Sequence, residues 1–433
     1  MIEISIPINI NFTFNNEITI NNIAEKIQDL EIENLILNHF IIEYDKIITT
    51  ELCGEKYEHN NEKKRYKRAG KGERKILTML GELDLKLDKI RDKLTGKIFK
   101  PLTQLLDIEP YKNHQDDIAF ASADIATKNT YRDTKYVIEN FLKKSLSPTS
   151  INRQVIKIGK EIKEFMKNKN KDNEENYDYF YADSTKSHSQ EDLYKNDAKV
   201  AMTTDKTGKK IFLYCGVNES WDDVKEELDE LNVIHPNAVL ISDAEPGLKN
   251  TLSSGDRRYQ LDFIHFINDI GFNLWKESDL DLKTRKDMKK WAEKIIYKLK
   301  NQVEKYANDK ETLKMKINEC VDKLKEFNEY LDELGCKDTA KFVKKHSNFI
   351  VTFAILATEG QKIPWNSNII ERLMGEIQKR CKHKWMRWTT QGQESILNLI
   401  LVRYTNPENY EEFKNKKLKR ENIKNIQTKI TIS

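Results

Sequence analysis

The sequence predicts an α/β protein in which a block of helices interrupts a mixed β-sheet, and a mostly helical region precedes that sheet. Three observations support this prediction. Apolar side chains repeat at helical spacing over much of residues 76–165. Short aromatic and apolar runs typical of strands begin at residue 177. Helical spacing returns over residues 264–345, with many charged residues between the apolar ones.

Composition leaves the partner of the protein open. The 433 residues are enough for two or three domains, and 74 Lys and Arg nearly balance 70 Asp and Glu. The net charge of +4 does not indicate nucleic acid by itself, so the distribution of charge must decide. No run approaches twenty apolar residues, which predicts no membrane span. The five cysteines form no C-x-x-C pair, which favours reduced thiols in the cytoplasm over disulfides or a zinc site.

Residues 1–60 are expected to form a segment of strand and helix. Isoleucines alternate with other residues over much of Met1–Thr13, which predicts a strand. Glu3 stands where a secretory signal would carry basic residues, so no leader is predicted. A helix is expected around Asn22–Phe40.

Residues 61–166 are expected to form a helical DNA-binding region. It opens with a basic run from Lys63 to Lys75, in which Glu73 is the first acidic residue. A solvated linker and a surface that contacts phosphates are both compatible with this pattern. From residue 76 onward we expect mainly helices.

The end of this region is compatible with a helix-turn-helix. A periodic stretch over 119–142 precedes Ser147 and Pro148, which are expected as the N-cap and first residue of a new helix. Apolar residues line one face of that helix. Polar side chains that could read a major groove lie elsewhere on it, namely Asn152, Arg153, Gln154 and Lys157. An ordinary two-helix hairpin is the alternative interpretation. The polar segment Lys167–Asn176 is then expected to be a linker between domains.

The predicted sheet begins after this linker. Strands are expected at 177–183, 199–204, 210–217, 238–242 and 258–261, and helices at 221–231 and 246–252. Three strands joined by hairpins, a crossover helix and a buried parallel strand follow the order of a ribonuclease-H-like core, assigned to residues 177–263. The helical insertion is assigned to 264–355 and the last part of the core to 356–408. A basic tail, 409–433, is expected to fray.

Three acidic side chains stand at the ends of predicted elements. Asp183 follows an aromatic strand, and Asp243 directly follows the buried run 238–242. The carboxyl ends of parallel strands are where α/β folds place their sites. Glu371 lies near the start of a helix beside its apolar face, which favours it over Glu376. Carboxylates that converge could hold two Mg²⁺ ions, whereas each residue alone is more typical of a turn or a helix surface than of a site.

Residues 379–388 combine cations with tryptophans. Cations neutralise phosphates and indoles stack on unpaired bases, so the segment could contact DNA. The residues concerned are Lys379, Arg380, Lys382, Lys384, Trp385, Arg387 and Trp388. The alternative is a basic helix end against which the tryptophans pack.

These residues resemble a known family. Y-A-D-S-T around Asp183, L-I-S-D-A-E-P-G-L-K around Asp243, and N-I-I-E-R-L-M-G-E around Glu371 are similar to the three acidic blocks of Mutator-like DDE transposases of insertion sequences. The likeness is clearest over residues 177–405. Asp262 and His265 match a Cys/Asp-x-x-His motif of that superfamily, for which a structural or DNA-end-organising role is expected.

The resemblance implies an enzyme that cuts and joins DNA. Asp183, Asp243 and Glu371 would be the catalytic and metal-binding residues for two Mg²⁺ ions, with Mn²⁺ as a substitute. Double-stranded DNA, as terminal inverted repeats and as target, would be the partner of a homo-oligomer associated with the nucleoid. Two alternatives remain: a domesticated transposase that only binds DNA, and a structure-specific nuclease without strand transfer.

Overall fold

The computed structural model describes Ile4, Ile6 and residues 19–55, 64–172, 176–191, 195–277, 279–384 and 386–420. The chain divides into two compact units, residues 1–154 with 416–433, and residues 155–415. The division falls inside helix α6, Pro148–Lys171, rather than at the expected linker. Buried Ile158, Ile162 and Met166 continue the apolar face of α6, which explains why the polar segment is helical up to Lys171. None of the described helices is long and apolar enough to cross a membrane.

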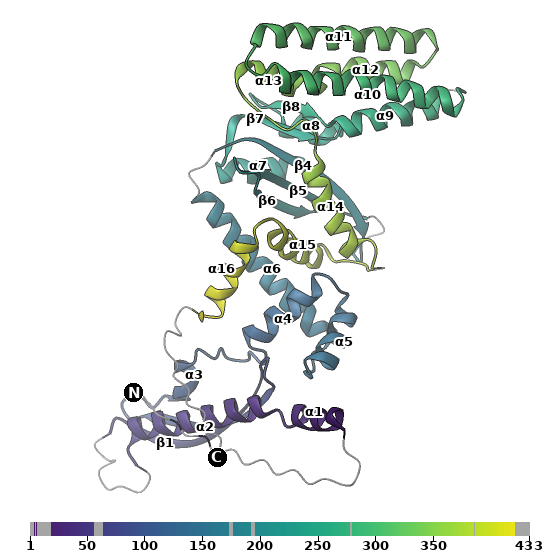
Figure 1. Ribbon diagram of the computed structural model, residues 1–433. Coiled ribbons are helices and arrows are strands. Elements are labelled where there is room, and N and C mark those ends of the chain that lie inside the picture. Colours follow the sequence, from purple (N-terminus) through teal and green to yellow (C-terminus); the bar gives the residue numbers. More distant parts are fainter. Residues whose placement is uncertain are drawn as a thin grey trace. The chain divides into compact units, whose positions relative to one another are not determined.

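The larger unit contains a five-stranded mixed sheet (Figure 1). The strands are β4 (Tyr177–His188), β5 (Lys195–Thr204), β6 (Lys210–Val217), β7 (Ile234–Ser242) and β8 (Arg258–Leu261). Their order is β6-β5-β4-β7-β8. The pairs β4–β5 and β5–β6 are antiparallel, whereas β4–β7 and β7–β8 are parallel. The predicted succession of three hairpin-linked strands and a parallel strand is therefore confirmed, and the strand expected at 258–261 is also parallel to its neighbour.

The crossover that makes β7 parallel to β4 is helix α7, Trp221–Leu231. The Ser220 hydroxyl caps this helix by accepting the Asp223 N–H at 3.1 Å. The Asp223 carboxylate in turn accepts the Ser220 N–H at 2.7 Å. Its apolar stripe, including Val224 and Leu228, is fully buried. A parallel pair requires such a long connection, so the hydrophobic pattern of α7 decides the direction of β7.

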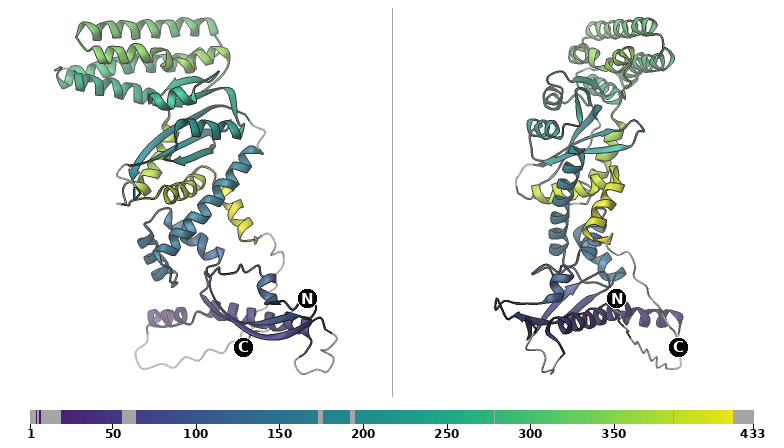
Figure 2. Two further views of the ribbon diagram at one scale, coloured as in Figure 1. Left: turned by 180° about the vertical axis from the view of Figure 1, so that it is seen from behind. Right: turned by 90° about the vertical axis from the view of Figure 1, so that its left-hand side faces the viewer.

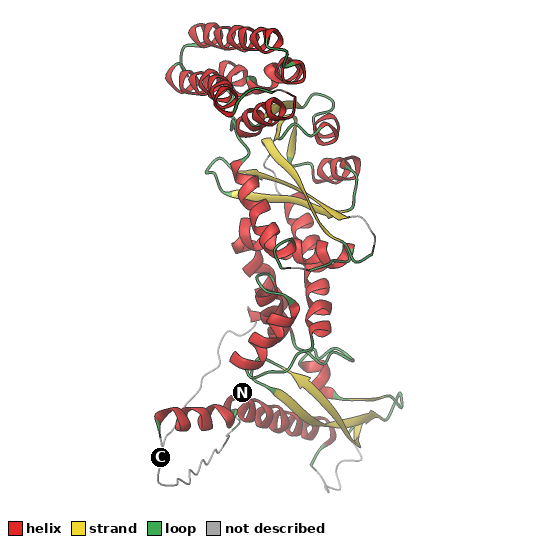
Figure 3. Cartoon of the chain, turned by 90° about the vertical axis from the view of Figure 1, so that its right-hand side faces the viewer, coloured by secondary structure: helices red, strands yellow, loops and turns green. Residues whose placement is uncertain are grey.

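Helices cover both faces of this sheet (Figures 2 and 3). Helices α7 and α8, Pro246–Leu252, pack on one face. Helices α14, Asn368–Cys381, and α15, Thr390–Thr405, cover the other. A Cβ at Gly159 of α6 would lie 2.3 Å from the Ser395 carbonyl oxygen, so glycine is needed where α6 crosses α15.

A block of helices separates β8 from α14 along the chain. It consists of α9 (Phe263–Glu277), α10 (Leu282–Lys305), α11 (Lys310–Glu333), α12 (Lys337–Ile350) and α13 (Thr352–Glu359). Buried Leu324, Phe327 and Leu331 of α11 form part of its interior. The expected all-helical insertion is confirmed, and it brings α14 to the sheet only after about a hundred residues.

The smaller unit contains a second, antiparallel sheet that the sequence reading missed. Helices α1 (Ile20–Asp29) and α2 (Ile32–Cys53) precede strands β1 (Tyr66–Leu77), β2 (Glu82–Asp92) and β3 (Ile98–Phe99). Leu83, Leu85 and Leu87 alternate with charged residues and pack against Ile41 of α2. This spacing of two indicates a strand, so the expectation of helices from residue 76 is wrong for 76–99. The basic run is β1 rather than a linker.

The remaining elements of the N-terminal part are helical, as expected. They are α3 (Pro101–Leu105), α4 (Asp116–Ala126), α5 (Tyr131–Phe141) and the start of α6. The helix expected around Asn22–Phe40 is broken at Glu31, which has a φ of +43°. The strand expected over Met1–Thr13 lies outside the described residues, apart from Ile4 and Ile6.

The expected fraying tail instead begins as helix α16, Pro407–Lys417. Tyr410 and Phe413 are buried, and Lys169 of α6 pairs with Glu412. These contacts hold the helix, so the expected tail is ordered up to Arg420. Residues 421–433 lie outside the described part of the chain.

Candidate active site

The sheet brings Asp183 and Asp243 together. Tyr181 of β4 pairs with Ile241 of β7 in parallel register, so the two aspartates stand at the same level two residues further on. Equal spacing from a paired position also places both side chains on one side of the sheet. Asp243 comes directly after β7, at the carboxyl end of a parallel strand, as the sequence predicted.

The ionisation of Asp183 reports its surroundings. Burial, together with the negative charges of Asp243 and Glu371, raises the pKa of this carboxyl from 3.8 to about 7. The Ser184 N–H, which donates to Asp183 Oδ1 at 2.7 Å, and the nearby His265 act in the opposite direction. The pKa thus identifies three carboxyl groups within electrostatic reach of one another.

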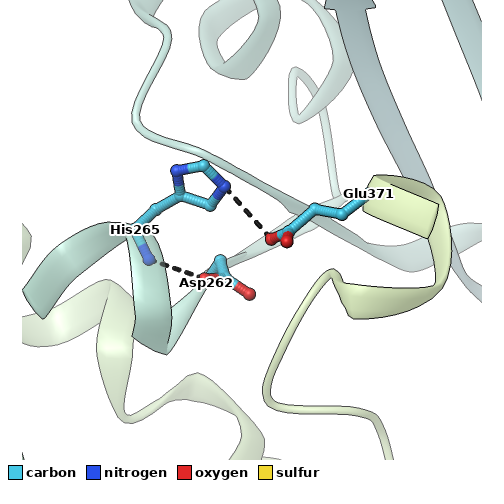
Figure 4. A group of neighbouring side chains, drawn as sticks. All are labelled: Asp262, His265 and Glu371. Atoms are coloured by element: carbon cyan, nitrogen blue, oxygen red, sulfur yellow. Dashed lines mark hydrogen bonds and ion pairs between the residues drawn. The ribbon is translucent and has the colours of Figure 1, made fainter. Parts of the chain in front are cut away.

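Glu371 lies in the first turn of α14, where the helix dipole favours a negative charge. Its Oε1 is 3.2 Å from His265 Nε2 (Figure 4). The same oxygen accepts the Ser367 hydroxyl at 3.2 Å. Glu376, the rival candidate, instead pairs with Lys379 at 2.7 Å. The contacts therefore direct Glu371, and not Glu376, toward the aspartates.

Asp262 connects the two helices that carry the other residues of this cluster. Its side chain is fully buried between β8 and α9. One oxygen accepts the His265 N–H at 2.7 Å, and the other accepts the Ser367 N–H at 2.5 Å and its hydroxyl at 3.1 Å. Asp262 thereby caps α9 and fixes the residue that precedes α14. This arrangement agrees with the structural role expected for the motif.

Two sets of residues could hold a metal ion. Oxygen and nitrogen atoms of Asp262, His265 and Glu371 lie within 4.8 Å of one another. Both oxygens of Asp262 already accept backbone N–H groups, so this carboxylate is used for capping. Asp183, Asp243 and Glu371 supply the hard oxygen ligands that Mg²⁺ prefers. Their mutual repulsion, visible in the raised pKa of Asp183, is what a divalent cation would relieve.

A cleft of about 340 Å³ extends from Asp243 along the helical insertion. His265, Asp269 and Asn273 of α9 line one wall, and His346 belongs to the wall formed by α12. Burial, and then the charge of Asp243, raise the pKa of Asp269. Sequence reasoning missed Asp269, although it lies four residues after His265 and therefore on the same helix face.

The basic and aromatic segment 379–388 is only partly available to a partner. Arg380 and Trp388 are each 2% exposed, and the guanidinium lies 4.7 Å from the indole centroid. Trp388 also exchanges backbone bonds with β4, donating to the His188 carbonyl at 2.9 Å. For these two residues the alternative, a helix end packed by tryptophan, holds.

The other cations of this segment differ in exposure. Lys379, Lys382 and Arg387 are exposed and Lys384 is half-buried. Trp385 lies outside the described residues. Contact of these side chains with DNA remains a prediction.

The start of the second helix of the possible helix-turn-helix is found where it was expected, whereas the periodic stretch before it forms two helices, α4 and α5. Ser147 accepts the Ser150 N–H at 3.0 Å, as expected for the N-cap of α6. Arg153 and Lys157 are exposed and Asn152 is half-buried. Gln154 is instead used inside the unit, where its oxygen accepts the Ser122 hydroxyl at 2.5 Å. DNA reading by the other three side chains remains a prediction.

An acidic site at the carboxyl end of a parallel strand is the usual position of the active site in an α/β enzyme. The profile described as Transposase, Mutator family, matches residues 21–413. The chain therefore belongs to the Mutator family of transposases. In a direct comparison with curated proteins, no match is found.

Proposed function

We propose that this transposase is a DDE enzyme that cleaves and joins DNA at the ends of an insertion sequence. The observation that supports this most is the parallel pairing of Tyr181 with Ile241, two residues before Asp183 and Asp243. The raised pKa of Asp183, to which the charges of Asp243 and Glu371 contribute, agrees with this arrangement. The order β6-β5-β4-β7-β8, with a helical block before α14, is what a ribonuclease-H-like core with an insertion requires.

Asp183, Asp243 and Glu371 would hold two Mg²⁺ ions, for which Mn²⁺ would substitute. Bound in this way, such ions activate a water or a DNA 3′-hydroxyl and stabilise the leaving oxygen. Asp183 lies on the central strand β4, between β7 and β5, and would be one of the residues that hold the ions. Raised pKa values at such a site would return toward normal when cations arrive.

His265 and Asp262 would act as positioning residues. His265 Nε2, at 3.2 Å from Glu371 Oε1, fixes the carboxylate at one edge and leaves its second oxygen for a ligand. Asp262 holds the backbone of Ser367, one turn before Glu371. Together these contacts would orient Glu371 toward the sheet before DNA binds.

The test uses a matched pair of glutamates on α14. Glu371→Gln and Glu376→Gln each remove one carboxylate from the same helix. With labelled DNA from the element end and Mg²⁺, we expect Glu371→Gln to lose at least about a hundredfold in cleavage rate. Glu376→Gln should retain most of the activity. Equal activity of both variants would contradict the assignment.

The two alternatives give different products. A protein that only binds DNA would shift the labelled fragment without nicking it. A structure-specific nuclease would nick branched DNA without joining ends to a target. Joined products that depend on Asp183 would support transposition over both.

A further inference from the structure

The N-terminal sheet concentrates positive charge. Residues 64–100, which contain β1, β2 and β3, have 13 Lys and Arg but only 5 Asp and Glu. This excess of eight exceeds the net charge of +4 for the whole chain. The rest of the protein is therefore acidic on balance.

Lys89 of β2 and Lys100, which directly follows β3, converge over a glycine. A Cβ placed on Gly72 of β1 would lie 2.5 Å from Lys89 Cε and 2.5 Å from Lys100 Cε. The two carbon atoms share that point, so they are at most about 5 Å apart. The absence of a side chain at residue 72 is what lets both lysine stems occupy this place.

Among the described residues, the two ammonium groups have no acidic partner, although Lys100 Nζ donates to the Glu73 backbone carbonyl at 3.4 Å. Neither Lys89 nor Lys100 has a carboxylate within ion-pair distance among the residues that the structure describes, whereas neighbouring cations of the sheet do. The pairs are Arg65–Asp92, Arg68–Asp88, Lys75–Glu82 and Lys86–Glu73. The convergence is thus not a salt-bridge network.

The surroundings make this arrangement unfavourable without an anion. Burial and the charges of Lys89 and Arg74 lower the pKa of Lys100. The Arg74 guanidinium donates to the Lys112 carbonyl at 3.0 Å, and this hydrogen bond keeps the guanidinium near Lys100. Asp45 of α2 offers only partial compensation, because its carboxylate accepts the Asp88 N–H at 2.7 Å. Half-buried like charges repel unless a counter-ion joins them.

We propose that Lys89 and Lys100, with Arg74 beside them, form a binding site for the phosphate groups of double-stranded DNA. The ligand is an extended polyanion, because exposed cations without a carboxylate partner among the described residues continue along the same sheet. They are Lys67, Lys71, Arg91 and Lys97. The choice of DNA rests on the proposed function, but the site needs neither the carboxylates nor their metal ions. It is separate from the α6 residues expected to read bases.

The test measures how binding depends on salt. Anisotropy of a labelled duplex is recorded with the full-length protein over a range of NaCl concentrations. Each phosphate contact contributes about 0.9 to the slope of log K against log salt. We expect Lys89→Gln/Lys100→Gln to reduce the slope by about 1.8. The control Lys75→Gln/Lys86→Gln removes two charges that already have partners, and it should reduce the slope by less than half as much.

A second variant changes geometry without changing charge. The methyl group of Gly72→Ala would displace the ends of two flexible side chains and no backbone atom, so the fold should tolerate it. We expect the slope to fall although the net charge is unchanged. An unchanged slope in Gly72→Ala together with equal effects of both double variants would overturn the site, because only net charge would then matter.

Two further arms separate the outcomes. If millimolar inorganic phosphate protects the lysines from acylation but the DNA slope is the same in every variant, the site binds small anions and the proposal fails. Asp183→Asn should keep the wild-type slope while losing cleavage. If the lysine variants keep the wild-type salt slope while Asp183→Asn loses cleavage, the phosphate site fails and the proposed function stands. If the lysine variants lower the slope while Asp183→Asn still cleaves bound DNA, the proposed function fails and the phosphate site stands.

Discussion

Replacing Asp183 by Asn is expected to stabilise the metal-free protein while abolishing its activity. The carboxyl has a pKa of about 7 in the folded state, against 3.8 ordinarily, because of burial and the nearby Asp243 and Glu371. Such a difference corresponds to about 4 kcal/mol at most. Since Asp183 titrates together with its neighbours, about 2 kcal/mol is the more realistic gain above pH 7.

The sign follows from proton binding. Between pH 4 and pH 7 the folded protein keeps a proton on Asp183 that the unfolded chain releases. Stability from this group is therefore present at low pH and falls as pH rises toward 7. Asparagine cannot ionise, so the variant should lack this decline, and its advantage over the wild type should grow from pH 4 to pH 7.

Urea unfolding of both proteins in EDTA, at pH 5 and pH 8, measures the effect. We expect the midpoint of Asp183→Asn to exceed that of the wild type at pH 8, and the difference to be much smaller at pH 5. Millimolar Mg²⁺ should then stabilise the wild type more than the variant, because only the wild type keeps the full ligand set. A variant that is less stable than the wild type at pH 8 would refute the reasoning.

Three other substitutions test the supports of the site. Asp262→Ala should cost about 2–4 kcal/mol in urea unfolding, because a helix cap is lost and the buried Ser367 N–H loses its acceptor; a loss below about 0.5 kcal/mol would contradict this. Gly159→Ala should cost about 1–3 kcal/mol, since its methyl meets the Ser395 carbonyl, and a neutral effect would show that the helices can separate. His265→Ala should slow cleavage while leaving duplex affinity unchanged, which single-turnover kinetics and anisotropy can check.

Much of the larger unit follows from local pattern. The ranges 210–217, 221–231, 246–252 and 258–261 were predicted with the observed bounds. In each, the apolar spacing agrees with the turn or cap signal at its ends, as at Ser220. Asp243 could be placed because the carboxyl end of a buried parallel strand is a known position for a site, whereas Asp183 lies inside β4, which continues past the end expected at residue 183.

Other features depend on contacts that spacing does not encode. Charged residues alternate with the leucines of β2, and the many charged residues favoured a helix over the strand that packs on α2. Arg380 is charged yet buried, because the chain after α14 folds back and places the Trp388 indole against its guanidinium. The convergence of Lys89 and Lys100 depends on how residue 100 approaches β1, which the sequence leaves undetermined.

The most direct test of the central claim is a crystal of the protein soaked in Mn²⁺ and measured for anomalous scattering. Two peaks contacted by Asp183, Asp243 and Glu371, with Asp262 still bonded to the Ser367 N–H, are the predicted result. A single peak held by Asp262, His265 and Glu371, or no peak near Asp183, would contradict it.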